Sequence, residues 1–296
     1  PEKTACDVSV LVPAFNEAQR ISPTVAAMVE YFRGRSMSFE VLIIDDGSTD
    51  GTGSAVAKCF TEVRVLNGDG NLYWNGGMNM AWRGAIKEGF DYYIWLNDDV
   101  SLSADALSVM FESLRSACAD CGTDPVIVGC FCEADGCSHA YGGFHVEKSI
   151  WGTTKRRVLP DGKIKRCNTF NGNFVLIPNS VVRKVGVLDD HFTHSFGDID
   201  YGYRCMENDV PMYITPDYVG ECARNPVERN WYDYNVTIKE RYRRMVQPTG
   251  LPPGEYFYAC KKNGNFIAGS VILLKLYLRL LFPKFWSKVS RSKDGE

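Results

Sequence analysis

The sequence predicts an α/β fold with a mainly parallel central sheet flanked by helices. Short apolar runs alternate with helical patterns through the first half of the chain, which is typical of βαβ units. Polar turns follow several of these runs, as in open α/β sheets that bind ligands at the carboxyl ends of their strands. The 296 residues are 45% apolar and 23% charged, a globular composition that argues against disorder.

The predicted elements follow one another in a regular order. The first strand is the apolar run from Val8 to Val12, which Pro13 ends. Turn residues at 45–51 and a glycine-rich turn at 68–77 separate later elements. The other expected strands are 40–44, 63–66, 92–96, 126–130 and 174–177, and the expected helices are 21–33, a helix beginning at Thr52, and 78–88. The segment 142–171 is polar and rich in Lys and Arg.

A linker and a basic tail divide the chain. Gly250 to Gly254 contains two prolines and predicts a boundary between a main domain over 1–249 and a C-terminal helical extension over 250–296. Its apolar helix, Phe266 to Trp286, is interrupted by Lys275 and Arg279, so a membrane span is not expected. Peripheral contact of residues 264–296 with an anionic membrane, a helix packed on the main domain and a contact between two copies all fit this pattern.

Charge and cysteine content limit the class of protein. A net charge of −3 gives no reason to expect nucleic-acid binding. Eleven cysteines at irregular spacings, with no apolar leader after Pro1, favour the reducing cytosol over a secreted disulfide framework. Cys118 and Cys121 have a zinc-like C-x-x-C spacing, but the later cysteines fit no standard zinc module, so buried or free thiols are favoured.

Two acidic turns are candidates for chemistry. Asp98 and Asp99 follow the strand 92–96, where a carboxylate can hold Mg²⁺ or Mn²⁺ against a diphosphate. Asp45 and Asp46 follow the strand 40–44, where an Asp can accept hydrogen bonds from a base or a ribose. Each pair can equally be a turn that ends its strand, because Asp is common in turns for conformational reasons.

A third acidic motif begins at Gly197 with the sequence Gly-Asp-Ile-Asp-Tyr. Asp198 is expected to start a helix, where its carboxylate can act as a general base toward an acceptor hydroxyl. The alternative is a helix cap without a catalytic role. Asp200 fits a structural acid better than a second catalyst.

The ordered set of motifs resembles the inverting family-2 glycosyltransferases of the GT-A fold. The set is Pro-Ala-Phe-Asn-Glu, Asp-Asp-Gly-Ser-Thr-Asp-Gly-Thr, Asn-Asp-Asp and Gly-Asp-Ile-Asp-Tyr, and the similarity covers roughly residues 7 to 225. The resemblance implies a nucleotide-sugar half at about 1–125 and an acceptor half at about 126–249. It also implies a divalent metal, Mg²⁺ or Mn²⁺, at Asp99 and a catalytic base at Asp198.

The resemblance implies a donor pocket as well. Its residues would be Pro13, Ala14, Phe15, Glu17, Asp45, Asp46, Trp74, Gly76, Gly77, Asn79, Asn97 and Asp98. Acceptor contacts are expected from Trp151, Asn173, His194 and Asp200. The chain departs from the family pattern at three places: Asn97 replaces an acid, Gly197 replaces a Glu, and Cys222 stands where a metal-binding His is often found. A thiolate suits Mg²⁺ or Mn²⁺ poorly, so Cys222 is expected to be structural.

Two further stretches, 70–78 and 171–174, look like those of bacterial surface-polysaccharide rhamnosyl- and galactofuranosyltransferases. This favours dTDP-rhamnose as donor over UDP-galactofuranose or another UDP-hexose, and a glycan or polyprenyl-linked acceptor. Tyr73 and Trp74 could stack on base or sugar, or be core aromatics. A homo-oligomer is compatible with the sequence. An inactive sugar-nucleotide-binding protein and a nucleotidyltransferase are the alternatives, although Val12 to Glu17 lacks the glycine- and basic-rich loop of the latter.

Overall fold

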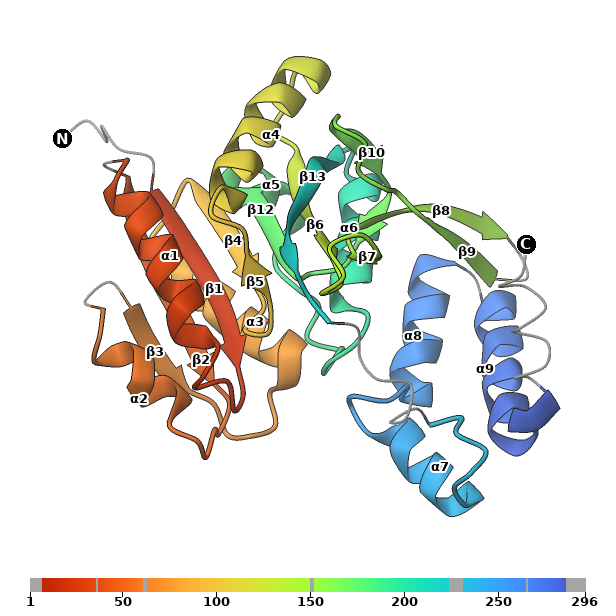
Figure 1. Cartoon of the computed structure of the whole chain (residues 1–296). Coiled ribbons are helices and arrows are strands. Elements are labelled where there is room, and N and C mark those ends of the chain that lie inside the picture. The colour runs from red at the N-terminus through yellow and green to blue at the C-terminus, as the bar shows by residue number, and fades with distance from the viewer. Residues whose placement is uncertain are drawn as a thin grey trace. The chain divides into compact units, whose positions relative to one another are not determined.

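The computed structural model describes residues 7–35, 37–60, 63–149, 152–223, 231–264 and 266–285 (Figure 1). The chain forms two compact units. The sheet unit consists of Pro1–His145, Arg156–Thr193 and Gly197–Arg224, and the helical unit consists of Val146–Lys155, His194–Phe196 and Asn225–Glu296. The division after Arg224 lies before the predicted boundary at residue 249. Trp151, Trp286 and the tail charges Lys288, Arg291 and Lys293 lie outside the described residues.

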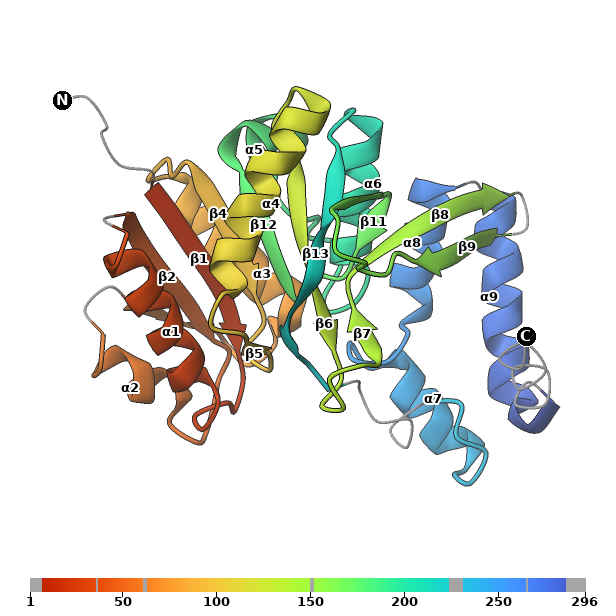
Figure 2. The same ribbon diagram turned by 45° about the horizontal axis from the view of Figure 1, so that its top comes forward.

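A mixed central sheet organises the sheet unit, in the order β10-β13-β6-β12-β4-β1-β2-β3 (Figure 2). Four neighbouring strands are parallel: β1 (Asp7–Ala14), β2 (Ser38–Asp45), β3 (Val63–Asn67) and β4 (Tyr92–Leu96). Next to them, β12 (Phe174–Pro178) runs antiparallel to both β4 and β6 (Val126–Cys132), and β6 is parallel to β13 (Met212–Glu221). The predicted fold class, a mainly parallel sheet flanked by helices, is confirmed.

Short strands complete the two sheets. In the central sheet, β10 (Lys165–Cys167) is an edge strand, while β5 (Ser101–Leu102) pairs with β13 and β7 (His139–Tyr141) pairs with β6. A separate sheet has the order β11-β8-β9, with bounds Thr169–Phe170, Gly143–Ser149 and Gly152–Arg157. The polar segment 142–171 is therefore largely extended, which its charged composition did not predict.

Helices cover both faces of the central sheet. One core layer joins alternate β1 residues such as Val10 to α1 (Ile21–Arg33) and α4 (Ala106–Cys121). The other layer joins Leu11 to α3 (Tyr73–Ile86), α5 (Asn179–Val185) and α6 (Gly197–Glu207). The period-2 alternation along β1 separates these layers, because successive strand side chains point to opposite faces. A short helix, α2 (Thr52–Ala57), follows the turn after β2.

The sequence located most of these elements. The helix 21–33 and the strand 92–96 agree with α1 and β4, whereas α3 begins at Tyr73 inside the expected glycine-rich turn. The cysteines of the described residues are free, and these residues contain no group of three or more His, Cys, Asp or Glu side chains placed to hold a metal. Among residues with described positions, no helix has the length and apolar character of a membrane span.

Within the described residues, the helical unit contains three helices, α7 (Ile238–Val246), α8 (Pro253–Asn263) and α9 (Phe266–Leu281), besides parts of β8 and β9. The expected linker is thus partly helical, because α8 starts at Pro253. The small core of this unit contains Trp231, Met245, Leu276 and Leu280. The buried Arg241 ties α7 to α9, since its Nε donates to the Leu280 carbonyl at 3.2 Å.

Candidate active site

The carboxyl ends of the parallel strands bring the predicted acidic turns together. Ala14 is in register with Asp45, and Asp45 with Asn67, so β1, β2 and β3 end at one edge of the sheet. The Asp46 amide also donates to the Ala14 carbonyl at 3.0 Å. This edge is where open α/β sheets bind their ligands.

The loop after β1 is held by the turn after β2. Asn16 adopts a left-handed φ of 58°, and its amide donates to Ser48 Oγ at 2.9 Å. Its side-chain oxygen in turn accepts from the Thr49 amide at 2.9 Å. The Pro-Ala-Phe-Asn-Glu and Asp-Asp-Gly-Ser motifs are therefore one structure. Phe15 projects from it with its side chain 56% exposed, so an aromatic face is open to a ligand.

Asp45 and Asp46 shape this edge through backbone hydrogen bonds. The Asp45 carboxylate accepts from the Ser48 amide at 3.0 Å and the Gly53 amide at 3.1 Å. Asp46 accepts from the Gly70 amide at 2.8 Å and the Tyr73 amide at 2.9 Å. Asp46 thus fixes the start of α3 to the end of β2. Their predicted contacts with a nucleotide stay predictions.

Asp98 and Asp99 follow β4 and are electrostatically unusual. Asp98 Oδ2 accepts from the Phe15 amide at 3.0 Å, and burial raises the pKa of Asp98 to about 7. Burial also raises the pKa of Asp99, the Arg20 guanidinium opposes this rise, and the Glu17 carboxylate adds to it. Asp99 Oδ1 is buried and has no hydrogen-bond partner within the described residues. Such an oxygen is costly to desolvate unless a donor or a cation meets it.

Asp99 fits a divalent cation that is bound jointly by the protein and by the phosphates of a substrate. Mg²⁺ commonly takes one or two protein carboxylates and completes its shell with phosphate oxygens and water. A single protein ligand at this edge is consistent with that mode. Arg20, which forms an ion pair with Glu17, is a site residue that the sequence did not single out, although its spacing of three residues from Glu17 was a usable signal.

Cys222 lies near Asp99 but is unsuited to bind a hard cation. It is buried, and burial raises the pKa of its thiol to about 12, with the Asp99 carboxylate adding to the rise. Its sulfur accepts from Asn173 Nδ2 at 3.7 Å. Asn173 is itself buried, and its carbonyl accepts from the Asn97 amide at 2.9 Å. Asn173 therefore supports the strand end, and its predicted acceptor contact stays a prediction.

Trp74 links Asn97 to the candidate base. Its indole Nε1 donates to Asn97 Oδ1 at 2.6 Å. A Cβ added to Gly172 would lie 2.5 Å from Trp74 Cζ2 and 3.2 Å from Asp198 Cβ, so both side chains lie against this glycine. Asp198 Oδ2 accepts from the Gly172 amide at 3.0 Å, and Oδ1 accepts from the Ile199 amide at 2.7 Å. Asp198 is therefore held at the start of α6, beside the ring that contacts Asn97.

The presence of glycine at position 197, directly before the candidate base, has a steric explanation. A Cβ at Gly197 would lie 1.8 Å from Asn75 Oδ1. Asn75 is fully buried, and its Nδ2 donates to the carbonyls of Asp189 at 3.0 Å and Phe192 at 2.6 Å. The side chain of Asn75 thus occupies the space that the family's Glu would need.

The side chains of Asp200 and Asn79 make hydrogen bonds within the fold. Asp200 is 1% exposed and accepts from Arg204 Nε at 3.0 Å, while the same guanidinium donates to the Val185 carbonyl at 2.9 Å. Asn79 is buried in α3, where its Nδ2 donates to the Leu188 carbonyl at 3.1 Å. Both residues position the segment before α6, and their predicted ligand contacts stay predictions.

The places of the other predicted site residues are described by their packing and burial. A Cβ on Gly77 would lie 3.1 Å from Pro13 Cβ, and one on Gly76 would lie 3.4 Å from Leu72 Cβ, so these glycines allow close packing around α3. Ala14 is buried within β1. His194 belongs to the helical unit, where burial lowers its pKa.

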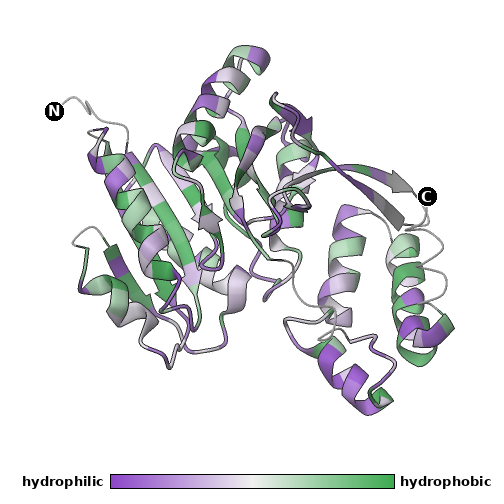
Figure 3. Cartoon of the chain, viewed as in Figure 1, coloured by the Kyte–Doolittle hydropathy of each residue, from purple (hydrophilic) through white to green (hydrophobic). Residues whose placement is uncertain are grey.

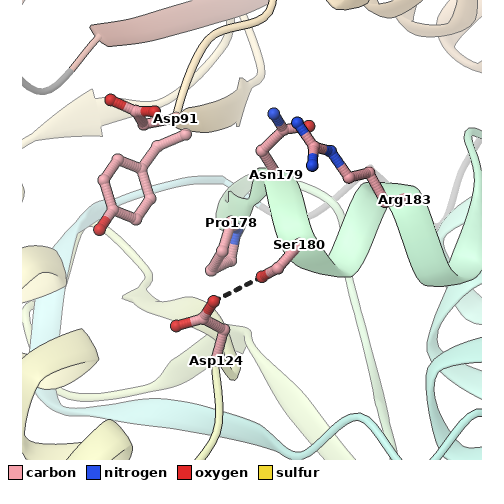
Figure 4. Close-up of a pocket in the computed structure, with 7 residues that line it drawn as sticks. Asp91, Asp124, Pro178, Asn179, Ser180 and Arg183 are labelled. Atoms are coloured by element: carbon pink, nitrogen blue, oxygen red, sulfur yellow. Dashed lines mark hydrogen bonds between the residues drawn. The ribbon is translucent and has the colours of Figure 1, made fainter. Parts of the chain in front are cut away.

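A groove of about 600 Å³ lies away from this edge (Figure 4). Its lining residues are Asp91, Tyr92, Asp124, Pro178, Asn179, Ser180 and Arg183. It lies where β4 begins, and Ser180 Oγ already donates to Asp124 Oδ2 at 2.5 Å. The groove therefore shares no residue with the acidic edge.

A family model and curated proteins match parts of this chain. The model of the family described as "Glycosyl transferase family 2" matches residues 9–192. The chain is 30% identical over 122 residues to "Glycosyltransferase AglD" of Haloferax volcanii, covering 40% of this chain and 19% of that protein. It is 30% identical over 100 residues to the dolichyl-phosphate beta-glucosyltransferase of Saccharomyces cerevisiae, covering 33% and 29%. The matched segments thus span under a third of these curated relatives.

Solved structures share the fold at low sequence identity. The mannosyltransferase PcManGT from Pyrobaculum calidifontis, in complex with GDP-Man and Mn²⁺, matches with a TM-score of 0.50 and 17% identity, over 92% of this chain and 70% of that one. S. aureus TarS 1-349, in complex with UDP-GlcNAc, matches with a TM-score of 0.53 and 14% identity, over 89% and 72%.

Proposed function

Since the chain belongs to glycosyl transferase family 2, we propose that it transfers a sugar from a nucleotide-sugar donor to an acceptor hydroxyl with inversion at the anomeric carbon. The observation that supports this most is the arrangement at the carboxyl ends of the strands. There Asp99 presents a buried oxygen without a hydrogen-bond partner in the described chain, and Trp74 connects Asn97 to the region of Asp198.

In the proposed reaction, Asp198 accepts the proton of the acceptor hydroxyl. The acceptor oxygen then forms a bond to the anomeric carbon from the side opposite the diphosphate, and the bond from that carbon to the phosphate oxygen breaks. The electron pair of the broken bond leaves with the nucleoside diphosphate. The two backbone amides that bind Asp198 orient its carboxylate for this role, as a general base must lie within hydrogen-bond reach of its substrate.

Asp99 is the residue that would hold a divalent cation, Mg²⁺ or Mn²⁺. When bound, such a cation neutralises charge on the departing diphosphate. Mn²⁺ accompanies the nucleotide sugar in the PcManGT structure, which supports this assignment. Phe15, exposed at the same edge, would offer a stacking face to the donor base.

The donor we propose is dTDP-rhamnose or a UDP-sugar, and the acceptor is a glycan or a polyprenyl-linked oligosaccharide of a cell-surface polysaccharide. The relatives bound to UDP-GlcNAc and GDP-Man support a nucleotide sugar in general, and the name of the yeast relative supports a lipid-linked acceptor. The rhamnose assignment depends on the motif resemblance at 70–78 and 171–174.

The test begins with binding and proceeds to turnover. Thermal shifts of the full chain against a panel of nucleotide sugars, with Mg²⁺ or Mn²⁺, would identify the donor, because ligand binding stabilises the folded state. Asp198→Asn should then retain donor binding and lose transfer, while Asp99→Ala should lose the metal-dependent part of binding. Glu112→Gln is the matched control, since Glu112 is an exposed carboxylate on α4.

Normal transfer by Asp198→Asn would remove Asp198 as the base. Donor binding without transfer or hydrolysis by the wild-type chain would favour an inactive binding protein. Release of pyrophosphate from a nucleoside triphosphate would favour a nucleotidyltransferase.

A further inference from the structure

The helical unit exposes an apolar face along α9. Ile267, Leu274 and Leu281 are 60%, 61% and 50% exposed. Phe285, four residues after Leu281, is 64% exposed. Spacings of seven residues place Ile267, Leu274 and Leu281 on one face of α9, which ends at Leu281, and Phe285 lies just beyond the helix. Further exposed apolar side chains along the same segment are Phe266, Tyr277, Leu278 and Phe282.

The opposite face of α9 already forms the core of this unit. Leu276 and Leu280 are buried there with Trp231 and Met245. A Cβ on Gly269 would lie 3.1 Å from the Phe257 ring, which shows that α8 and α9 pack closely. Figure 3 shows α9 as the most hydrophobic of the three helices in this unit. The outer face of α9 therefore takes no part in the internal packing of the unit.

The charged residues of the sequence segment that contains α9 all have one sign. From Tyr256 to Lys293 the sequence contains no Asp or Glu, and it contains Lys261, Lys262, Lys275, Arg279, Lys284, Lys288, Arg291 and Lys293. The whole chain, in contrast, has a net charge of −3. Arg279 stacks on the Tyr232 ring at 3.7 Å, whereas Lys275 is exposed beside the apolar face. The sequence segment that contains α9 is thus basic and apolar, although the chain as a whole is acidic.

We propose that the outer face of α9 docks on an anionic lipid bilayer, with the helix lying in the plane of the headgroups. Its 16 residues extend about 24 Å, less than the roughly 30 Å of a hydrocarbon core, so it suits an interfacial position better than a span. Apolar side chains bordered by Lys and Arg are the pattern of helices that bind such interfaces.

Charge also distinguishes the bilayer from a second copy of the chain. An isologous dimer through this face would place the same basic surface on both sides of the contact, because a two-fold interface pairs identical patches. Those like charges would repel, whereas an anionic membrane attracts each of them. The occupant that the charge pattern favours is therefore an anionic bilayer.

The test is flotation of the full chain with phosphatidylcholine vesicles, with and without phosphatidylglycerol. The wild-type chain should float with the anionic vesicles only, and high salt should weaken binding because it screens the basic residues. Leu274→Gln combined with Leu281→Gln should lower the bound fraction by about tenfold or more. Lys275→Glu should lower it to a smaller extent. Because these side chains are exposed, the thermal midpoint of each variant should stay close to that of the wild type.

The matched control is Leu159→Gln, since Leu159 is 51% exposed but lies in the sheet unit. This control should bind as the wild type does. The proposal is overturned if the wild-type chain does not float, or if the outer-face variants float equally well. It is also overturned if sedimentation shows a dimer that the Leu274 and Leu281 changes dissociate. Flotation requires no turnover, so its result is independent of the proposed transferase activity.

Discussion

Gly197→Ala tests the steric account of the residue before the candidate base. The added Cβ would lie 1.8 Å from Asn75 Oδ1 and 2.8 Å from Asn75 Cγ, which forces the amide out of its place. Asn75 would then lose its hydrogen bonds to the carbonyls of Asp189 and Phe192. Losing two buried hydrogen bonds costs about 2–3 kcal/mol, a cost similar to overpacking a core by one methyl group.

Making Gly197→Ala in a chain that already carries Asn75→Ala separates the steric effect from other effects of the substitution. In Asn75→Ala the hydrogen bonds are already lost, and the remaining Asn75 Cβ would lie 3.6 Å from the new methyl group, an ordinary contact. Gly197→Ala should then change the free energy of unfolding by less than about 0.5 kcal/mol in that background. The expected coupling between the two positions is about 2 kcal/mol.

Guanidinium unfolding followed by tryptophan fluorescence would measure the free energies of the four chains of this cycle. Gly254→Ala is the control, because a Cβ there meets nothing within 4 Å. It should be neutral or slightly stabilising, as replacing a helical glycine usually is. Additive effects of the two substitutions, or a Gly197→Ala chain as stable as the wild type, would refute the steric explanation.

Three other substitutions test the positioning contacts. Trp74→Phe keeps a ring but removes the donor to Asn97, so kcat at saturating donor should fall about tenfold while the donor Kd changes little; an unchanged kcat would contradict this role. Arg204→Lys leaves the buried Asp200 without its guanidinium partner and should cost about 3 kcal/mol of unfolding free energy, measured by denaturation. Asp46→Ala removes two backbone hydrogen bonds and should cost about 1–3 kcal/mol, with weaker donor binding in calorimetry.

Local sequence patterns predicted the parallel half of the sheet well. The apolar runs of β1 and β4 are buried on both faces, and such strands are short, nearly continuous and ended by polar turns. The start of α3 was missed because Gly76 and Gly77 indicate a turn when only intrinsic preference is considered. In the structure these glycines lie in the first turns of α3, where Gly77 allows close contact with Pro13.

The candidate site was predictable as a set of motifs but not as a set of contacts. Asp98, Asp99 and Asp45 could be predicted as site residues because each follows a strand, and an α/β sheet of this class binds its ligands at the strand ends. The contact of Phe15 with Asp98 joins residues 83 positions apart, and no local pattern encodes it. The burial that raises the pKa of Asp98 likewise depends on the packed loops around it.

The departures from the family pattern at Asn97 and Gly197 both face the start of α3. Trp74 donates to Asn97, and the neighbouring Asn75 fills the space beside Gly197. Positions 97 and 197 differ in whether the acidic residue of the family pattern could be accommodated there. An Asp at position 97 could still accept from the indole N–H, although a third carboxylate beside Asp98 would increase charge repulsion. A Glu at position 197 cannot fit while Asn75 stays in place, so a return to the family residue there requires a smaller side chain at position 75.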